Sequence, residues 1–249
     1  MFGGSGFSSF LEDANEVIVE TRFGAPSDAV TVGTVQGVRV AFLPRHGRTH
    51  EWPAHRVNYR ANIDAMRQLG VRALLAPFTA GSLQPGIAPG EFVVVDQLVD
   101  RTNGRSDTFY DRFADGPCHV SLADPYDPAL RALIIEVARE LGITVHEQGT
   151  VVVVNGPRFS TRAESAWFSS AGWHVVNMTQ YPEAALAREA GIGFAGVGLV
   201  TDYDAGIAGG PEVEPVNQEE VFACFERNLD RVRGLLRAVI GRVPGIVAS

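Results

Sequence analysis

Three observations predict that this chain folds as a single α/β domain. Short apolar runs of strand length, such as residues 151–154 and 193–200, alternate along the chain with stretches of helical spacing. Several of these predicted strands run directly into polar loops, and ligands of α/β sheets collect at the carboxyl ends of strands. The length of 249 residues and the 45% hydrophobic content are typical of one soluble globular domain, so we expect the domain to span residues 1–249.

Composition argues against several classes of function. The net charge of −8 and the pI of about 5.3 argue against a nucleic-acid backbone as the partner. Apolar runs are far shorter than the roughly 20 residues that cross a membrane, so no membrane partner is expected. The opening residues lack the basic start and apolar core of a signal peptide. Together with only two cysteines, Cys118 and Cys224, this predicts a cytoplasmic protein.

The first half of the chain predicts a hairpin, a helix and two further strands. β-branched runs flank the turn Gln36-Gly37, which is typical of a hairpin. The next stretch has apolar residues at helical spacing and a glycine stop at Gly70. The predicted elements are strands at 30–35 and 38–43, a helix at 56–69, strands at 73–77 and 92–98, and a long loop at 100–115.

The second half begins with a well-marked helix, since Asp127 can cap its start and Pro128 suits its first position. Asn217 can cap the last helix in the same way. Residues 205–215 are rich in Gly and Pro, which predicts a mobile segment. The predicted elements are helices at 128–141, 165–172, 182–191 and 217–243, and strands at 151–154, 175–176 and 193–200.

The strand at 193–200 ends in Thr201-Asp202-Tyr203-Asp204, which places two carboxylates one residue apart. Because side chains of a strand alternate between its faces, Asp202 and Asp204 are expected to project to the same side. Two acceptors would then converge on one ligand. The alternative is that one of them only caps the next helix.

Three segments are candidates for binding an anion. A glycine turn at residues 2–8 carries Ser5, but it lacks the third glycine of a dinucleotide fingerprint, and Met1-Phe2 is too short for the strand that this fingerprint requires. Residues 44–50 contain two arginines and two histidines that can be cationic, although a solvated basic loop is the alternative. Residues 78–82 offer hydroxyl and backbone donors. His46 and His50 lie in a loop without partnering carboxylates, so no metal site is predicted.

Five motifs taken together resemble the trimeric purine nucleoside phosphorylase family, with the greatest likeness to its 5′-methylthioadenosine phosphorylase branch. They occur in the family's order and with similar spacing from Gly3 to about Leu236. The resemblance implies a mixed sheet distorted into a partial barrel and flanked by helices, in a homotrimer or a dimer of trimers. The motifs are Arg45-His46-Gly47-Arg48, Thr79-Ala80-Gly81-Ser82, Gly156-Pro157-Arg158-Phe159-Ser160, Asn177-Met178-Thr179 and Thr201-Asp202-Tyr203-Asp204.

The resemblance implies reversible phosphorolysis, in which phosphate displaces a purine from C1′ of a ribosyl group with inversion and without a resident cofactor. Asp204 would share a proton with N7 of the purine and Asp202 would accept from its 6-amino group; these two and His46 are the implied catalytic residues. Met178 would lie under the ribose and Phe159 against the base, with Asn177 nearby. The implied phosphate-binding residues are Ser5, Arg45, His46, Thr79, Ala80 and Thr179.

The same resemblance predicts which nucleoside is used. Ser160 stands where 6-oxopurine enzymes of the family carry a glutamate, which favours adenine. Val221 and Phe222 suit a 5′-thioether, and His119, donated across a subunit interface, completes the wall of this pocket. Gln218 stands where methylthio-specific relatives are apolar. We therefore expect methylthioadenosine as the substrate and adenosine as a second one. A general purine nucleoside phosphorylase and a non-catalytic nucleotide sensor are the alternatives.

Overall fold

The computed structural model describes residues 1–3, 11–114, 116–205 and 216–247, and it contains two sheets. The first has the strand order β1-β4-β3-β2 and the second the order β7-β9-β10-β5-β11-β6-β8. The strands are β1 (Phe2–Gly3), β2 (Glu12–Val17), β3 (Val30–Val35), β4 (Val38–Pro44), β5 (Ala73–Ser82), β6 (Phe92–Val94), β7 (Gln97–Arg101), β8 (Val145–His146), β9 (Thr150–Val154), β10 (Val175–Asn177) and β11 (Gly193–Asp202).

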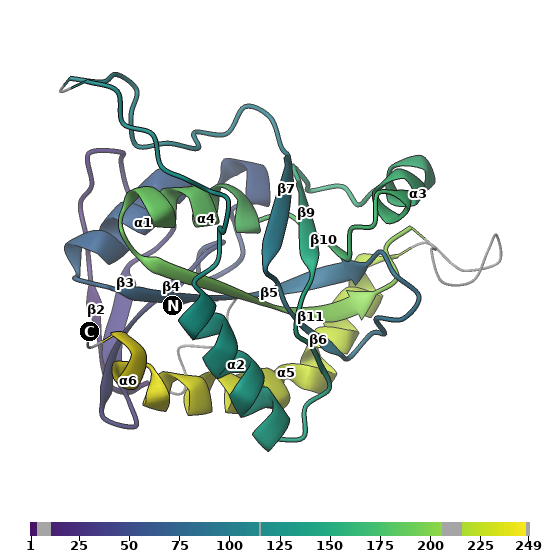
Figure 1. The fold of residues 1–249 in the computed structure, drawn as a ribbon. Coiled ribbons are helices and arrows are strands. Elements are labelled where there is room, and N and C mark those ends of the chain that lie inside the picture. Colours follow the sequence, from purple (N-terminus) through teal and green to yellow (C-terminus); the bar gives the residue numbers. More distant parts are fainter. Residues whose placement is uncertain (4–10, 115, 206–215, 248–249) are drawn as a thin grey trace.

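The long strands β5 and β11 form the centre of the larger sheet (Figure 1). They run parallel, whereas β10 pairs antiparallel with β5 and β6 pairs antiparallel with β11. The sheet is therefore mixed, as the sequence analysis expected. In the smaller sheet, β1 pairs in parallel with β4 through Phe2 and Gly3. β1 has only two residues, so it remains too short for the strand that a dinucleotide fingerprint requires, but it does add to the edge of β4.

Helices cover both faces of the larger sheet (Figure 1). α1 and α4 pack on one face, and α2 and α5 on the other. Alternate residues of β11 enter the two cores: Phe194 packs with α1 and α4, whereas Ala195 and Val197 pack with α2 and α5. A strand buried on both faces must be apolar throughout, which explains its composition. The helices are α1 (Tyr59–Gln68), α2 (Pro128–Glu140), α3 (Arg162–Ser170), α4 (Gln180–Glu189), α5 (Gln218–Arg242) and α6 (Pro244–Val247), with a 3₁₀ turn at Ala54–Arg56.

The helix starts follow from capping side chains. Asp127 accepts hydrogen bonds from the backbone N–H groups of Ala129 and Leu130 at the start of α2, both at 2.9 Å. At the start of α3, Thr161 and Glu164 form a reciprocal capping box. This box begins the helix three residues before the predicted position 165, because Thr161 satisfies backbone donors that would otherwise be unpaired.

The predicted strand at 92–98 was wrong, since the chain forms two strands there. The β6 strand pairs with β11 and β7 pairs with β9, so the two lie in different parts of the sheet. The break falls at Asp96, whose carboxylate accepts from Gly149 N at 2.9 Å while its own N–H donates to the Gly149 carbonyl. These two bonds to Gly149 hold the backbone where it turns away from β11 and toward β9.

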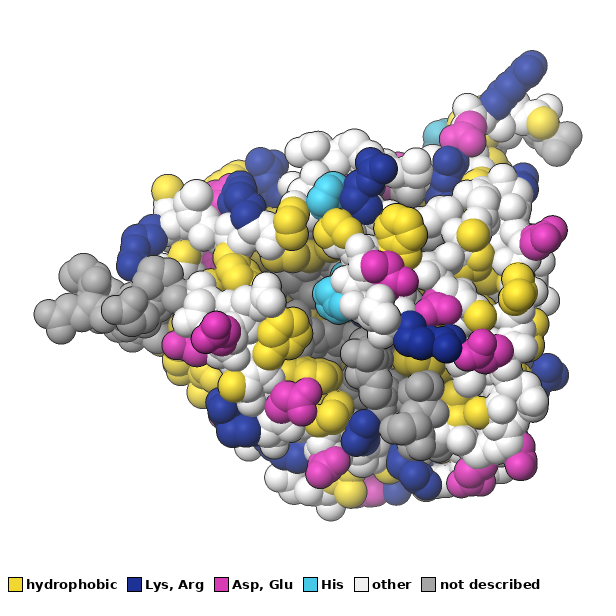
Figure 2. Space-filling model, turned by 180° about the vertical axis from the view of Figure 1, so that it is seen from behind, with side chains coloured by type: hydrophobic (Ala, Val, Ile, Leu, Met, Phe, Trp, Pro, Cys, Tyr) yellow, Lys and Arg dark blue, Asp and Glu magenta, His cyan; other side chains and the backbone are white. Residues whose placement is uncertain are grey.

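The segment between β7 and α2 projects from the body as an extended excursion (Figure 1). Its residues 102–114 and 116–127 form no helix or strand, which confirms the predicted long loop apart from its first two residues, which end β7. On the face in Figure 2, hydrophobic side chains border a central hollow, and acidic and basic side chains are interspersed rather than gathered by sign. None of the helices in the described ranges has the length and apolar character that a membrane crossing needs.

Candidate active site

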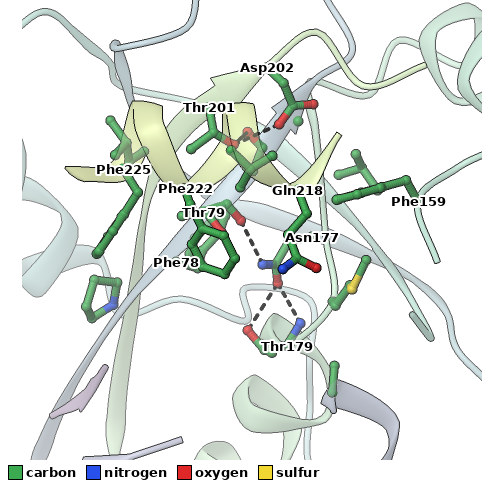
Figure 3. Close-up of a pocket in the computed structure, with 18 of the residues that line it drawn as sticks. Phe78, Thr79, Phe159, Asn177, Thr179, Thr201, Asp202, Gln218, Phe222 and Phe225 are labelled. Carbon is green, nitrogen blue, oxygen red and sulfur yellow. Dashed lines mark hydrogen bonds between the residues drawn. The ribbon is translucent and has the colours of Figure 1, made fainter. Parts of the chain in front are cut away.

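A cavity of about 460 Å³ opens at the ends of β5, β10 and β11, against the first turns of α5. Figure 3 shows side chains from these elements converging on it. This is the sheet edge at which the sequence analysis placed a site. The predicted site residues that line it are Arg45, His46, Thr79, Ala80, Phe159, Ser160, Asn177, Met178, Thr179, Asp202, Asp204, Gln218, Val221 and Phe222.

Asp202 and Asp204 meet at one end of the cavity, but not by strand alternation. The β11 strand ends at Asp202, and Asp204 follows in a left-handed conformation with φ of 38°. The backbone N–H of Asp204 donates to Oδ1 of Asp202 at 2.8 Å, which holds the two together. A Cβ atom at Gly81 would lie 2.9 Å from that Oδ1 and 3.2 Å from Cβ of Asp204, so only glycine leaves room for the pair.

Burial changes the chemistry of both carboxyls. Burial, reinforced by the charge of Asp204, raises the pKa of Asp202 to about 6, although the hydroxyl of Thr201 donates to its Oδ2 at 2.7 Å. Burial also raises the pKa of Asp204, against the effect of Ser165, whose hydroxyl donates to its Oδ2 at 2.6 Å. Asp204 is 3% exposed, and Asp202 is the more open of the two. The pair can therefore hold a proton close to neutral pH.

The charge of Arg45 is balanced by Glu183, a residue that the sequence analysis missed. Its Nε donates to Oε1 of Glu183 and one terminal nitrogen donates to Oε2 at 2.9 Å, while the other donates to the Pro77 carbonyl at 3.3 Å. The Arg45 side chain is 4% exposed and the Glu183 side chain is fully buried. These bonds use three of five guanidinium hydrogens, so two remain for a ligand. Glu183 lies on α4 far along the chain, and no local pattern marks it as a partner.

His46 is neutral, contrary to the expectation that it adds positive charge. Burial and the neighbouring charge of Arg45 lower its pKa to about 4. Its Nδ1 lies 2.8 Å from the backbone carbonyl of Trp52, and its ring stacks on His50 at a centroid distance of 4.5 Å. Arg48 is not among the cavity-lining residues and is exposed, bonded to Glu16 at 2.7 Å. Arg45 therefore brings a positive charge to the cavity, and Glu183 supplies its counter-charge.

Asn177 ties together the two threonines on either side of it. Its Nδ2 donates to the Thr79 carbonyl at 3.1 Å, and its Oδ1 accepts from the N–H of Thr179 at 2.7 Å and from the Thr179 hydroxyl at 3.3 Å (Figure 3). The same Oδ1 also accepts from the Gln180 N–H at 2.9 Å. With its amide used in this way, Asn177 joins the end of β5 to the start of α4. Thr79 and Thr179 are thereby held together, and both line the cavity, as Arg45 does.

Met178 and Phe159 add apolar side chains to the lining of the cavity. Gly156 has φ of 64°, and a Cβ atom there would collide with Sδ of Met178, so glycine is needed for the methionine to occupy this place. Phe159 is 38% exposed at the cavity wall, with Ser160 beside it. This exposure shows that Phe159 is not part of the hydrophobic core.

The first turns of α5 close another side of the cavity with Gln218, Val221 and Phe222 (Figure 3). His119 lies on the projecting segment, where its ring meets Phe113 edge-on, and it is not among the lining residues. Ser5 lies outside the described residues, as do positions 206–215 of the predicted mobile segment. Within the described ranges, no group of three or more His, Cys, Asp or Glu residues is placed to hold a metal ion.

Comparisons with known proteins agree with this geometry. Residues 2–241 match the family model of the phosphorylase superfamily. An S-methyl-5′-thioadenosine phosphorylase of Mycolicibacterium smegmatis is 54% identical, covering 95% of this chain and 87% of that protein. A purine nucleoside phosphorylase of Streptomyces coelicolor is 50% identical, covering 98% of this chain and 88% of that protein. The structure of methylthioadenosine phosphorylase from Schistosoma mansoni in complex with adenine matches with a TM-score of 0.91 at 37% identity, covering 98% of this chain and 91% of that one.

Proposed function

Because this chain belongs to the phosphorylase superfamily, we propose that it cleaves 5′-methylthioadenosine with phosphate, giving adenine and 5-methylthioribose 1-phosphate. The protein is an enzyme of the pentosyltransferase type. The observation that carries the proposed substrate is a single cavity lined by an aspartate pair that can hold a proton, by the hydrogen-bond donors of Arg45 and Thr179, and by the apolar side chains of Met178 and Phe159. The aspartate pair would bind the purine, the donors would bind phosphate, and the apolar side chains would contact the sugar and the base.

Phosphate would bind where Arg45, Thr79 and Thr179 present donors, since an anion held away from water needs several hydrogen bonds. A phosphate oxygen would attack C1′ while the C1′–N9 bond breaks and its electron pair moves into the purine. Met178 would lie beneath the ribose, where a thioether cannot compete with the phosphate oxygen for C1′. A proton delivered to N7 would let adenine leave as a neutral molecule.

We propose Asp202 as the proton donor, which exchanges the roles that the sequence analysis gave to the two aspartates. An acid at neutral pH works best when its pKa lies near the operating pH, and the pKa of Asp202 is raised to about 6. Asp202 is also the more open to the cavity, whereas Asp204 is buried and accepts from Ser165. Asp204 would then accept from the 6-amino group of adenine.

The 5′ group would lie against α5. Val221 and Phe222 offer an apolar surface to a thioether, whereas the amide of Gln218 can bond a hydroxyl, so adenosine is the proposed second substrate. A general purine nucleoside phosphorylase is the second candidate. It is favoured by Gln218 and by the S. coelicolor relative, which carries that name at 50% identity.

We also propose a homotrimer, or a dimer of trimers, in which the projecting segment reaches a neighbouring subunit. Phe113 and Val120 on that segment are 41% and 40% exposed, which a subunit contact would bury. His119 would then complete the 5′ pocket of the neighbour. Phosphate would serve as co-substrate, without a resident cofactor, in the cytoplasm.

A substrate panel tests the function. The purified protein is incubated with methylthioadenosine, adenosine, inosine or guanosine, with and without phosphate, and free base is measured by chromatography. We expect adenine from methylthioadenosine first and adenosine second, only with phosphate and unaffected by a chelator. Base release without phosphate, or a preference for inosine or guanosine, would contradict the proposal. No release from any nucleoside despite binding would favour the nucleotide sensor.

A further inference from the structure

We propose that Arg105 is a positioning residue of the active site, which holds in place the loop that carries Phe159 and Ser160. This purine loop comprises residues 155–161, between β9 and α3. The proposal rests on the purine site of the proposed function. Arg105 is not among the lining residues of the cavity, so it would act through the purine loop rather than on a ligand.

The guanidinium of Arg105 makes five hydrogen bonds, and three of them hold the start of the purine loop. Its Nε donates to Oδ1 of Asn155 at 3.2 Å, and its Nη2 donates to the backbone carbonyls of Val154 at 3.3 Å and Asn155 at 3.1 Å. Nδ2 of Asn155 in turn donates to the Asn103 carbonyl at 3.2 Å, two residues before Arg105. The projecting segment is therefore bonded to the purine loop where that loop leaves β9.

The other two hydrogen bonds of Arg105 reach α4 and α1. Its Nη1 donates to the backbone carbonyl of Tyr181 and, at 3.4 Å, to the hydroxyl of Tyr59. The guanidinium also lies over the Tyr59 ring, 5.2 Å from the ring centroid. Tyr181 follows Thr179 by two positions, near the start of α4. Arg105 thus links the purine loop to the helix that begins beside the proposed phosphate site.

The number and type of these partners indicate a role in geometry rather than in ligand binding. A guanidinium has five N–H hydrogens, and in Arg105 all five are used within the protein. Arg45, by contrast, keeps two for an anion. The five acceptors of Arg105 are three backbone carbonyls, one amide oxygen and one hydroxyl. A lysine ammonium carries its donors on a single nitrogen, so it could not span acceptors that three guanidinium nitrogens reach.

Phe159 depends on such support because core packing does not fix a side chain that is 38% exposed. The far end of the purine loop is tied to α3 by the capping box of Thr161. Its near end is tied by Arg105 to the projecting segment and to α4. Loss of the Arg105 bonds should therefore displace Phe159. Thr179 should stay in place, because Asn177 holds it by bonds of 2.7 and 3.3 Å.

The test compares the steady-state kinetics of Arg105→Gln and Arg60→Gln, with methylthioadenosine and phosphate varied separately. Arg60 is the matched control because it bonds the same projecting segment to α1, through the exposed carboxylate of Asp111 at 2.7 Å. We expect Arg105→Gln to lower kcat/KM for the nucleoside by at least about tenfold, because a small misplacement of the bound substrate is costly. Its KM for phosphate should stay within about threefold of the wild-type value.

In Arg60→Gln both constants should stay within about threefold of the wild-type values, since an exposed ion pair contributes little. Equal losses for nucleoside and phosphate in Arg105→Gln would show a general structural role and overturn the proposal. The same nucleoside loss in Arg60→Gln would also overturn it, because the effect would then come from loosening the projecting segment.

Two further variants separate the hydrogen bonds of Arg105 from its charge, and they apply even if Arg105→Gln does not fold. Arg105→Lys keeps the charge but cannot span the acceptors, so it should show the same selective loss for the nucleoside, and full activity would overturn the proposal. Asn155→Ala removes one of the five acceptors, so it should lower kcat/KM for the nucleoside by a smaller factor. Unchanged nucleoside kinetics in Asn155→Ala, or a change confined to phosphate, would contradict the proposal.

Hydrogen exchange measured by mass spectrometry distinguishes this proposal from the proposed function, because it needs no substrate. The backbone amides of residues 155–161 should exchange faster in Arg105→Gln than in the wild type and in Arg60→Gln. Unchanged exchange in the purine loop would overturn the role of Arg105 even if the wild type releases adenine. If the wild type releases no adenine while the exchange changes as expected, the proposed function fails and Arg105 still positions this loop.

Discussion

Replacing Asp202 by Asn removes a proton donor while preserving the shape of the side chain, and the structure predicts how much activity is lost. With a pKa of about 6, Asp202 is protonated in about half of the molecules at pH 6 and in about one hundredth at pH 8. If this proton goes to the purine, kcat/KM for the nucleoside at saturating phosphate should fall about fiftyfold over that range. An amide cannot supply a proton, so Asp202→Asn should lower kcat by about a hundredfold or more. It should also abolish the fall of kcat/KM between pH 6 and pH 8, which is the pH limb that Asp202 causes.

The matched control is Asp204→Asn, which removes the neighbouring charge and leaves Asp202 in place. Because the charge of Asp204 raises the pKa of Asp202, its loss should shift the pH limb to lower pH. It should also relax base choice toward inosine, since an amide can donate to a 6-oxo group. Initial rates with methylthioadenosine and inosine between pH 5.5 and 8.5 measure both effects. If Asp204→Asn abolishes the limb and Asp202→Asn only changes base choice, the two roles are reversed. Equal, base-independent losses would show a structural pair.

Three other substitutions test the remaining parts of the site. Glu183→Gln leaves the guanidinium of Arg45 buried without its charge partner, so chemical denaturation should show a loss of about 3 kcal/mol in unfolding free energy. KM for phosphate should rise about tenfold because Arg45 loses its fixed orientation. A fall in KM for phosphate would show instead that the negative charge of Glu183 mainly weakens phosphate binding. Gln218→Val should reduce kcat/KM for adenosine by a factor that corresponds to about 1–3 kcal/mol, the contribution of one hydrogen bond, and should leave kcat/KM for methylthioadenosine unchanged. Loss of activity with both substrates would refute a hydrogen bond to the 5′-hydroxyl. Gly81→Ala should displace Asp202, raising KM for the nucleoside more than KM for phosphate, and unchanged nucleoside kinetics would contradict the close approach of 2.9 Å.

The α/β class and most of the elements could be predicted from the chain because their signals are local. The apolar run at 193–200 is a strand buried on both faces, and Asp127 and Asn217 cap the helices that follow them. The position of the site at the ends of the strands followed from the same patterns, since polar loops after buried strands meet at one sheet edge. The family followed from five motifs in order, each weak by itself.

Long-range contacts decided the rest, and the sequence carries no local mark of them. Glu183 faces Arg45 across 138 positions, and Ser165 bonds Asp204 across 39. Asp202 and Asp204 converge because a backbone N–H and the space at Gly81 hold them together, not because of strand periodicity. Protonation states also depend on the tertiary structure, because burial and neighbouring charges set them. The sequence alone therefore named many of the side chains that line the cavity, although not Glu183, the buried partner of Arg45. Only the tertiary structure decided that His46 is neutral and that the pKa of Asp202 is raised.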